Sequence, residues 1–115
     1  MDKIKAIEER LHRNKDYIQN RIQKIERDLK RQTNPLEKDF AEQATQREND
    51  EVLEGLLISS REELKKINVA LKRIGEDEYL RCEVCGDEIP IARLEAVPYT
   101  NLCIRCAERA QAASK

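Results

Sequence analysis

Two amphipathic runs dominate the chain. In the first, from Met1 to about Thr33, apolar residues recur every three or four positions, with a single longer step at Asn14, and no glycine or proline interrupts them. The apolar positions are Ile4, Ile7, Leu11, Ile18, Ile22, Ile25 and Leu29. Lys, Arg, Glu and Gln fill the other faces, so the pattern predicts a long helix with a single apolar stripe.

The second run alternates steps of four and three along another stripe. Its positions are Leu53, Leu57, Ser60, Leu64, Ile67, Leu71 and Ile74. It stops at Gly75, which we expect to be the C′ residue that ends the helix in the left-handed conformation. Neither stripe is stable in water alone, so we expect the two helices to pack on each other.

An antiparallel pairing of the stripes predicts where the chain reverses. The residue numbers of facing positions then add up to a constant, which pairs Leu11 with Ile67 and Ile18 with Ser60 and places the reversal near Asp39. Asn14 and Ser60 interrupt the stripes at different levels. We expect these two polar residues to set the register of the helices at some cost in stability.

The segment PLEKDFAEQATQREND, residues 35–50, is poor in apolar residues and lies at this reversal. The second helix has two possible starts. Asn34 followed by proline is one N-cap, and Asp39 with Glu42 forms a later capping box, which the register favours. We therefore expect a hairpin whose tip lies near residues 34–44.

All four cysteines lie in two Cys-x2-Cys pairs, Cys82 with Cys85 and Cys103 with Cys106. Two such pairs at this separation place four thiolates around one tetrahedral ion, and Zn²⁺ is the default. Gly86 follows the first pair, where a knuckle needs an unhindered backbone. Four protein ligands close the coordination sphere, so we expect one structural Zn²⁺ and no catalytic site. A four-cysteine iron site and a pair of disulfides are the alternatives.

Composition agrees with an elongated helical protein. The 115 residues are 39% charged and 3% aromatic, which leaves too few bulky apolar groups for a large core. We predict a mainly α fold with two parts. Residues 1–75 form a long antiparallel coiled-coil hairpin, and residues 76–115 form a small four-cysteine zinc-knuckle module with a short C-terminal helix.

Several classes of protein are disfavoured. The net charge of −1 argues against binding nucleic acid by counterion release. No apolar run approaches the roughly 20 residues that span a bilayer, and the N-terminus lacks the apolar region of a secretory signal. We therefore expect a cytoplasmic protein that is neither an enzyme nor a membrane protein. A stripe paired within the chain favours a monomer.

The zinc-knuckle segment matches a longer motif, CxxCGxxIxxxRLxAxPxxxxCxxC. The matching residues are Cys82, Cys85, Gly86, Ile89, Arg93, Leu94, Ala96, Pro98, Cys103 and Cys106. With the two helical arms before it, the chain resembles the DksA/TraR family of bacterial transcription regulators. The resemblance implies a protein that binds RNA polymerase, inserts its hairpin into the secondary channel and modulates transcription initiation without reading DNA.

The family's tip motif, Asp-x-x-Asp-x-Ala, matches Asp39, Glu42 and Ala44. The resemblance implies that these residues contact the partner near its catalytic centre. Glu42 keeps the charge of the second aspartate but is one methylene longer, so its carboxylate lies in a different place.

Basic residues that longer family members use with guanosine tetraphosphate are replaced here by Ser59 and Ala107, while Lys66 remains. We therefore expect weak dependence on that nucleotide. Other basic residues of the second helix that are candidates for partner contacts are Lys65, Lys72 and Arg73. The alternative function is a zinc-knuckle protein that binds nucleic acid or senses redox state and dimerises through its hairpin.

Overall fold

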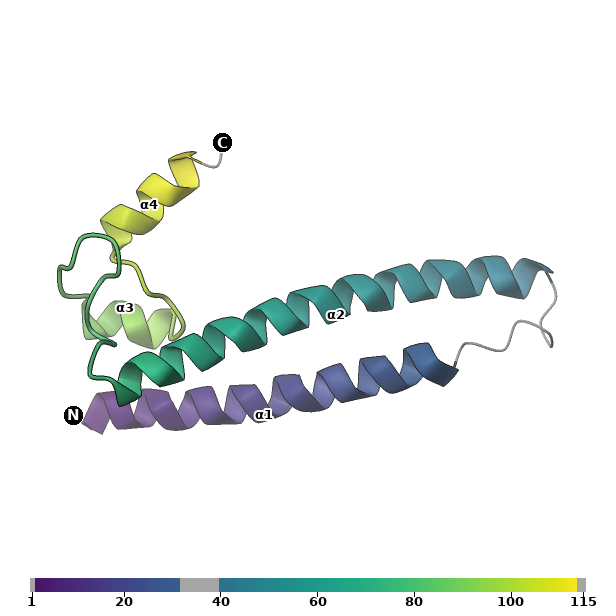
Figure 1. Ribbon diagram of the computed structural model, residues 1–115, viewed down its shortest axis with the longest axis horizontal. Helices are drawn as coiled ribbons and strands as arrows, with labels where there is room; N and C mark the ends of the chain where they lie inside the picture. Colours follow the sequence, from purple (N-terminus) through teal and green to yellow (C-terminus); the bar gives the residue numbers. More distant parts are fainter. Residues whose placement is uncertain (1, 32–39, 114–115) are drawn as a thin grey trace. The chain divides into compact units, whose positions relative to one another are not determined.

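The computed structural model describes the backbone of residues 2–31 and 40–113 and the side chains of residues 3–30 and 47–113. In these ranges the helices are α1 (Asp2–Arg31), α2 (Phe40–Gly75), α3 (Ile91–Ala96) and α4 (Ile104–Ala113) (Figure 1). The described residues form no strand, and Arg81 and Glu88 make an isolated β-bridge. The mainly α class is confirmed. Both predicted starts of the second helix, at Asn34 and at Asp39, lie outside the described residues.

The chain divides into two compact units. The first comprises Met1–Lys15 and Lys65–Lys115, and the second comprises Asp16–Leu64. Within each unit a stretch of α1 lies beside a stretch of α2 that runs in the opposite direction (Figure 1). The predicted antiparallel pairing is thus present. The predicted domains, residues 1–75 and 76–115, do not coincide with these two compact units, and that division stays a prediction.

The core of the first unit follows the predicted stripes. Leu11 and Ile67, which the register pairs, are both almost completely buried, and Ile7 is buried with them. Fully burying an aliphatic side chain of this size contributes about 1.5–3 kcal/mol. Ala70 is also buried, although the predicted stripe omits it. A small residue beside the stripe lets the helices approach closely.

The second unit buries Ile18, Ile22 and Ile25 of α1 and the polar Ser60 of α2. The hydroxyl oxygen of Ser60 accepts a hydrogen bond of 3.1 Å from Nε of Arg21, and Nη2 of the same arginine lies 3.2 Å from a carboxylate oxygen of Glu63. Ser60 therefore breaks the apolar stripe without leaving a buried hydroxyl unpaired.

The C-terminal end of α2 differs from the prediction. Gly75 is still helical, and the left-handed residue is Asp77, whose φ is 58°. The N–H of Glu78 donates to the carbonyl of Arg73 at 2.9 Å, and the N–H of Asp77 donates to that of Ile74 at 3.3 Å. These bonds form a Schellman motif with Asp77 at C′, two residues later than expected.

Among the helices in the described part of the chain, none combines the length and the apolar character that crossing a lipid bilayer requires.

Candidate metal centre

The fold brings the four cysteines together. The sulfur atoms of Cys82, Cys85, Cys103 and Cys106 all lie within 4.8 Å of one another. All four are free thiols, and the Cys85 and Cys103 sulfurs are 3.6 Å apart, well beyond a disulfide bond. Cys85 is exposed and the other three are buried. The structure therefore has the predicted cluster and not the alternative pair of disulfides.

The first knuckle is closed by main-chain hydrogen bonds. The N–H of Gly86 donates to the carbonyl of Cys82 at 3.0 Å, and the N–H of Cys82 donates to the carbonyl of Asp87 at 2.8 Å. Gly86 has a φ of 77°, in the left-handed region. A Cβ built there meets only the Arg81 side chain, at 3.8 Å, so the backbone conformation and not crowding favours glycine.

Hydrogen bonds from α3 hold the loop that leads into the second knuckle. The sequence pattern did not predict this helix. Its Arg93 donates from Nε to the carbonyl of Leu102 at 2.9 Å and from Nη2 to the hydroxyl of Thr100 at 3.4 Å. Leu102 directly precedes Cys103. The carbonyl of Cys103 then accepts from the N–H of Ala107 at 2.9 Å, next to the first turn of α4.

The two knuckles are also joined to each other. The N–H of Glu83 donates to the carbonyl of Asn101 at 2.9 Å, and the side-chain amide of Asn101 donates back to the Glu83 carboxylate. An exposed ion pair of 3.7 Å connects Asp87 and Arg105. These contacts hold the two Cys-x-x-Cys segments at a fixed separation.

The sulfur atoms differ in their affinity for protons. Hydrogen bonds from the main-chain N–H groups of Cys85 and Cys103 lower the pKa of Cys82 to about 6. The hydrogen bond with the Cys103 sulfur, together with burial, raises the pKa of Cys106 to about 12. Four thiolates at this spacing repel one another, and a bound divalent cation removes that repulsion. Four soft sulfur donors around one point fit Zn²⁺.

Tyr79 anchors the entrance to the module, the segment between the end of α2 and Cys82. Its hydroxyl donates to the carbonyl of Pro98 at 2.6 Å, and burial raises its pKa to about 12. The N–H of Ile89 donates to the carbonyl of Leu80 at 2.6 Å. The segment that follows α2 is thereby tied both to the loop before Cys103 and to the strand-like residues after the first knuckle.

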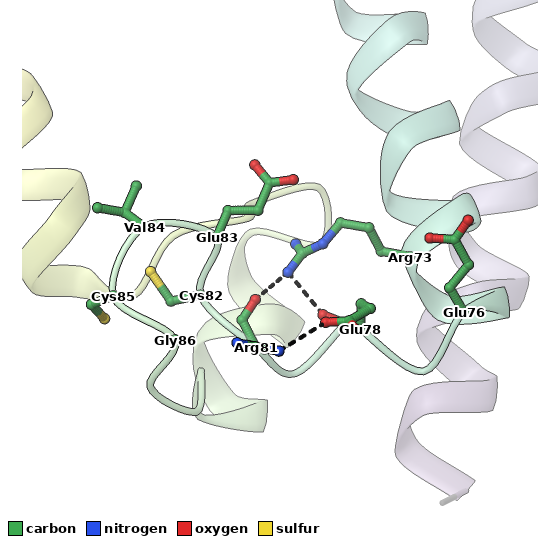
Figure 2. A pocket seen from close by; sticks show the side chains of 9 residues that line it. All are labelled: Arg73, Glu76, Glu78, Arg81, Cys82, Glu83, Val84, Cys85 and Gly86. Atoms are coloured by element: carbon green, nitrogen blue, oxygen red, sulfur yellow. Dashed lines mark hydrogen bonds and ion pairs between the residues drawn. The ribbon is translucent and has the colours of Figure 1, made fainter.

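Arg73 lies beside this entrance, at an open pocket of about 520 Å³ (Figure 2). The pocket is lined by Arg73, Glu76, Glu78, Arg81, Cys82, Glu83, Val84, Cys85 and Gly86. Arg73 is only 6% exposed, so among the basic candidates for partner contacts it has the least surface to offer. The other candidates on the second helix, Lys65, Lys66 and Lys72, are exposed.

The predicted tip falls largely outside the described residues. Asp39 lies outside the described residues, and so do the side chains of Glu42 and Ala44. The positions of Ser59 and Ala107, where the family's basic residues are absent, are exposed and half-buried, respectively. His12, which carries no predicted role, is exposed.

An antiparallel pair of long helices and a four-cysteine cluster define the class as a coiled-coil zinc-finger protein. Residues 6–74 match the model of the DnaK suppressor protein-like N-terminal domain, and residues 77–112 match that of the prokaryotic dksA/traR C4-type zinc finger. The chain belongs to the DksA/TraR family and carries one structural zinc site. Proteins of this family are transcription regulators, not enzymes.

Similar individual proteins support the same family assignment. The RNA polymerase-binding transcription factor DksA of Haemophilus influenzae is 39% identical over 77 residues, which cover 67% of this chain and 53% of that protein. The solved structure of transcription factor DksA2 from Pseudomonas aeruginosa matches with a TM-score of 0.85 and 27% identity, over 99% of this chain and 87% of that one. For the DnaK suppressor protein from Agrobacterium tumefaciens, the TM-score is 0.62 and the identity 37%, over 92% of each chain.

The chain spans about half the length of the curated relatives it matches, since the aligned residues cover 43% of one and 53% of another.

Proposed function

We propose that this protein binds RNA polymerase and inserts the tip of its helical hairpin into the secondary channel to modulate transcription initiation. The family supports the proposal, because the Haemophilus influenzae relative is an RNA polymerase-binding transcription factor. In this role the chain acts as a cytoplasmic monomer that regulates transcription without sequence-specific contacts to DNA.

The observation that carries the proposal is the antiparallel pairing of α1 and α2. The 36 residues of α2 rise about 54 Å at 1.5 Å per residue, and two paired helices are narrow enough to enter a channel. Asp39 and Glu42 lie at the reversal of the hairpin in the sequence. Such an element delivers two carboxylates to a site where low-dielectric surroundings strengthen their effect on a bound Mg²⁺ or a basic loop.

The surface of α2 supports a protein partner. Val52 and Leu56, one helical turn apart, are 63% and 46% exposed. Apolar side chains at the centre of an interface exclude water and contribute most of the binding energy. We assign them to the contact with the polymerase along the second arm.

The zinc module has a structural role in this proposal. We assign Cys82, Cys85, Cys103 and Cys106 as the ligands of the zinc ion, which closes its coordination sphere. From the first cysteine onward, residues 82–115 carry five acidic residues, Glu83, Asp87, Glu88, Glu95 and Glu108, against four basic ones, Arg93, Arg105, Arg109 and Lys115. This balance disfavours the alternative of a nucleic-acid-binding knuckle.

The test combines binding with transcription. The double variant Asp39→Asn/Glu42→Gln removes both tip charges, and Glu51→Gln/Glu54→Gln removes two exposed charges at the same spacing elsewhere on α2. We expect both variants to bind core RNA polymerase, and only the tip variant to change transcriptional output in a purified system. If the unmodified protein does not bind polymerase, the proposal is wrong.

A further inference from the structure

Arg73 differs from the other basic residues in the last part of α2. It is 6% exposed, whereas Lys65, Lys66 and Lys72 are exposed. Burying a guanidinium ion is unfavourable unless hydrogen bonds and opposite charge compensate for the lost hydration. The contacts of Arg73 must therefore offset this cost.

Those contacts all go to the segment that leads into the first knuckle. Nη2 of Arg73 donates to the carbonyl oxygens of Glu78, at 2.8 Å, and of Arg81 (Figure 2). The carbonyl of Arg73 itself accepts from the N–H of Glu78 at 2.9 Å. One residue thus holds the segment through both its main chain and its side chain. Arg81 directly precedes Cys82.

Few side chains of the segment itself anchor it. Glu76, Asp77, Glu78 and Arg81 are exposed, and Tyr79 is its fully buried side chain. The ion pair between Arg81 and Glu78, at 3.8 Å, is exposed and contributes little. The position of Cys82 relative to α2 therefore depends mainly on Arg73 and Tyr79.

The positive charge of Arg73 has no countercharge among the described residues. Its Nη1 is buried and has no hydrogen-bond partner among the described residues, and no described carboxylate forms an ion pair with it. The guanidinium lines the same pocket as Cys82 and Cys85. Since Zn²⁺ held by four thiolates has a net negative charge, a buried cation in the wall of the same pocket is favourable.

We propose that Arg73 is a positioning residue of the zinc site. It fixes the carbonyl groups that precede Cys82, and its charge compensates for that of the zinc–thiolate cluster. The coupling is reciprocal, because a contact that favours zinc binding is itself favoured by bound zinc. Zinc binding therefore stabilises the last turn of α2 through this side chain.

The affinity for zinc tests the proposal. Arg73→Met removes the charge and the hydrogen bonds, and Lys72→Met removes the same charge from the neighbouring exposed position. In competition with a chromophoric chelator, we expect Arg73→Met to bind zinc roughly 10- to 100-fold more weakly, the range found for residues that orient metal ligands. Lys72→Met should keep the affinity of the unmodified protein.

Arg73→Lys separates charge from geometry. The ammonium group keeps the charge, but its shorter side chain does not reach both carbonyl oxygens without a shift, so we expect an intermediate affinity. Unchanged affinity in Arg73→Met overturns the proposal. If that variant does not fold with zinc, unchanged affinity in Arg73→Lys overturns it instead.

Thermal unfolding distinguishes positioning from a general loss of stability. We expect the increase in Tm on adding zinc to be smaller in Arg73→Met than in the unmodified protein. An equal drop in Tm with and without zinc would mean that Arg73 stabilises the helix independently of the metal, which contradicts the proposal.

Discussion

The hydroxyl of Tyr79 donates a hydrogen bond of 2.6 Å to the main-chain carbonyl oxygen of Pro98, although the two residues lie 19 positions apart. Tyr79 is 2% exposed, so the bond is shielded from water. Replacing Tyr79 by Phe leaves the Pro98 carbonyl without its donor, and we expect a loss of about 1–2 kcal/mol. Urea unfolding of the zinc-loaded proteins measures this difference.

The same residue gives the stability a component that depends on pH. Burial raises the pKa of Tyr79 from 10.0 to about 12. Above pH 10 the unfolded chain loses this proton while the folded chain keeps it, so the contribution is complete below pH 10 and disappears towards pH 12. The stability of the unmodified protein should therefore fall more steeply across this range than that of Tyr79→Phe. Parallel curves would contradict the burial of the phenol.

Arg21 and Ser60 form a part-buried polar link between the helices of the second unit. Nε of Arg21 donates to the buried hydroxyl of Ser60. We therefore expect Arg21→Ala and Ser60→Ala each to lower the free energy of unfolding by about 1 kcal/mol. In a double-mutant cycle, the two changes should show a coupling energy of about 0.5–1.5 kcal/mol. Arg61 and Glu26, an exposed ion pair of 3.2 Å, provide the control, with a coupling of about 0.5 kcal/mol or less. Strictly additive losses at Arg21 and Ser60 would be inconsistent with this link.

Zinc removal should unfold the metal module selectively. The apolar side chains buried there, outside the cysteines, are Tyr79, Ile89, Leu94 and Pro98, too few to hold the knuckles without the ion. With a chelator, we expect rapid hydrogen exchange at the amides of Gly86 and Ala107, whose hydrogen bonds close the two knuckles. Amides of residues 47–64 serve as the control and should stay protected. Equal protection of Gly86 with and without zinc would refute a structural role for the metal.

Guanosine tetraphosphate should have little effect on the action of this protein. Ser59 and Ala107 lack the positive charge that the resemblance associates with the nucleotide, and Lys66 alone supplies less attraction for its phosphates. Transcription with the cognate polymerase, with and without the nucleotide, measures the effect. Ser59→Arg/Ala107→Lys is the complementary variant, in which we expect stronger dependence. Strong synergy in the unmodified protein would contradict the prediction.

The helical pair could be predicted because its signal is repetitive. Stripes such as the one through Leu11 and Ile18 repeat over many turns, and the antiparallel register follows from matching them. The cysteine cluster could also be predicted from the sequence, because two Cys-x2-Cys pairs leave one arrangement around a single ion. The sequence also places Gly86 where a knuckle needs an unhindered backbone, and the structure adds the reason, a φ of 77° that favours glycine.

Local features of the loops could not be predicted from the sequence in this way. Gly75 was expected to end α2 in the left-handed conformation, because glycine adopts that conformation most readily. The residue that adopts it is Asp77. The six residues of α3 are too few for a periodic signal. Arg73 resembles a surface residue in sequence, since a basic group in the last turn of a helix is usually solvated. Its burial depends on carbonyl groups of a loop whose path no sequence pattern specifies.

Site-directed cross-linking tests the central claim most directly. A photoreactive amino acid replaces Ala44 near the reversal of the hairpin, and the same group at exposed Arg109 of α4 is the control. In the complex with RNA polymerase, we predict that position 44 cross-links to the walls of the secondary channel close to the catalytic centre, and that position 109 does not. Cross-links from position 44 to a second copy of this protein, or to promoter DNA, would contradict the account.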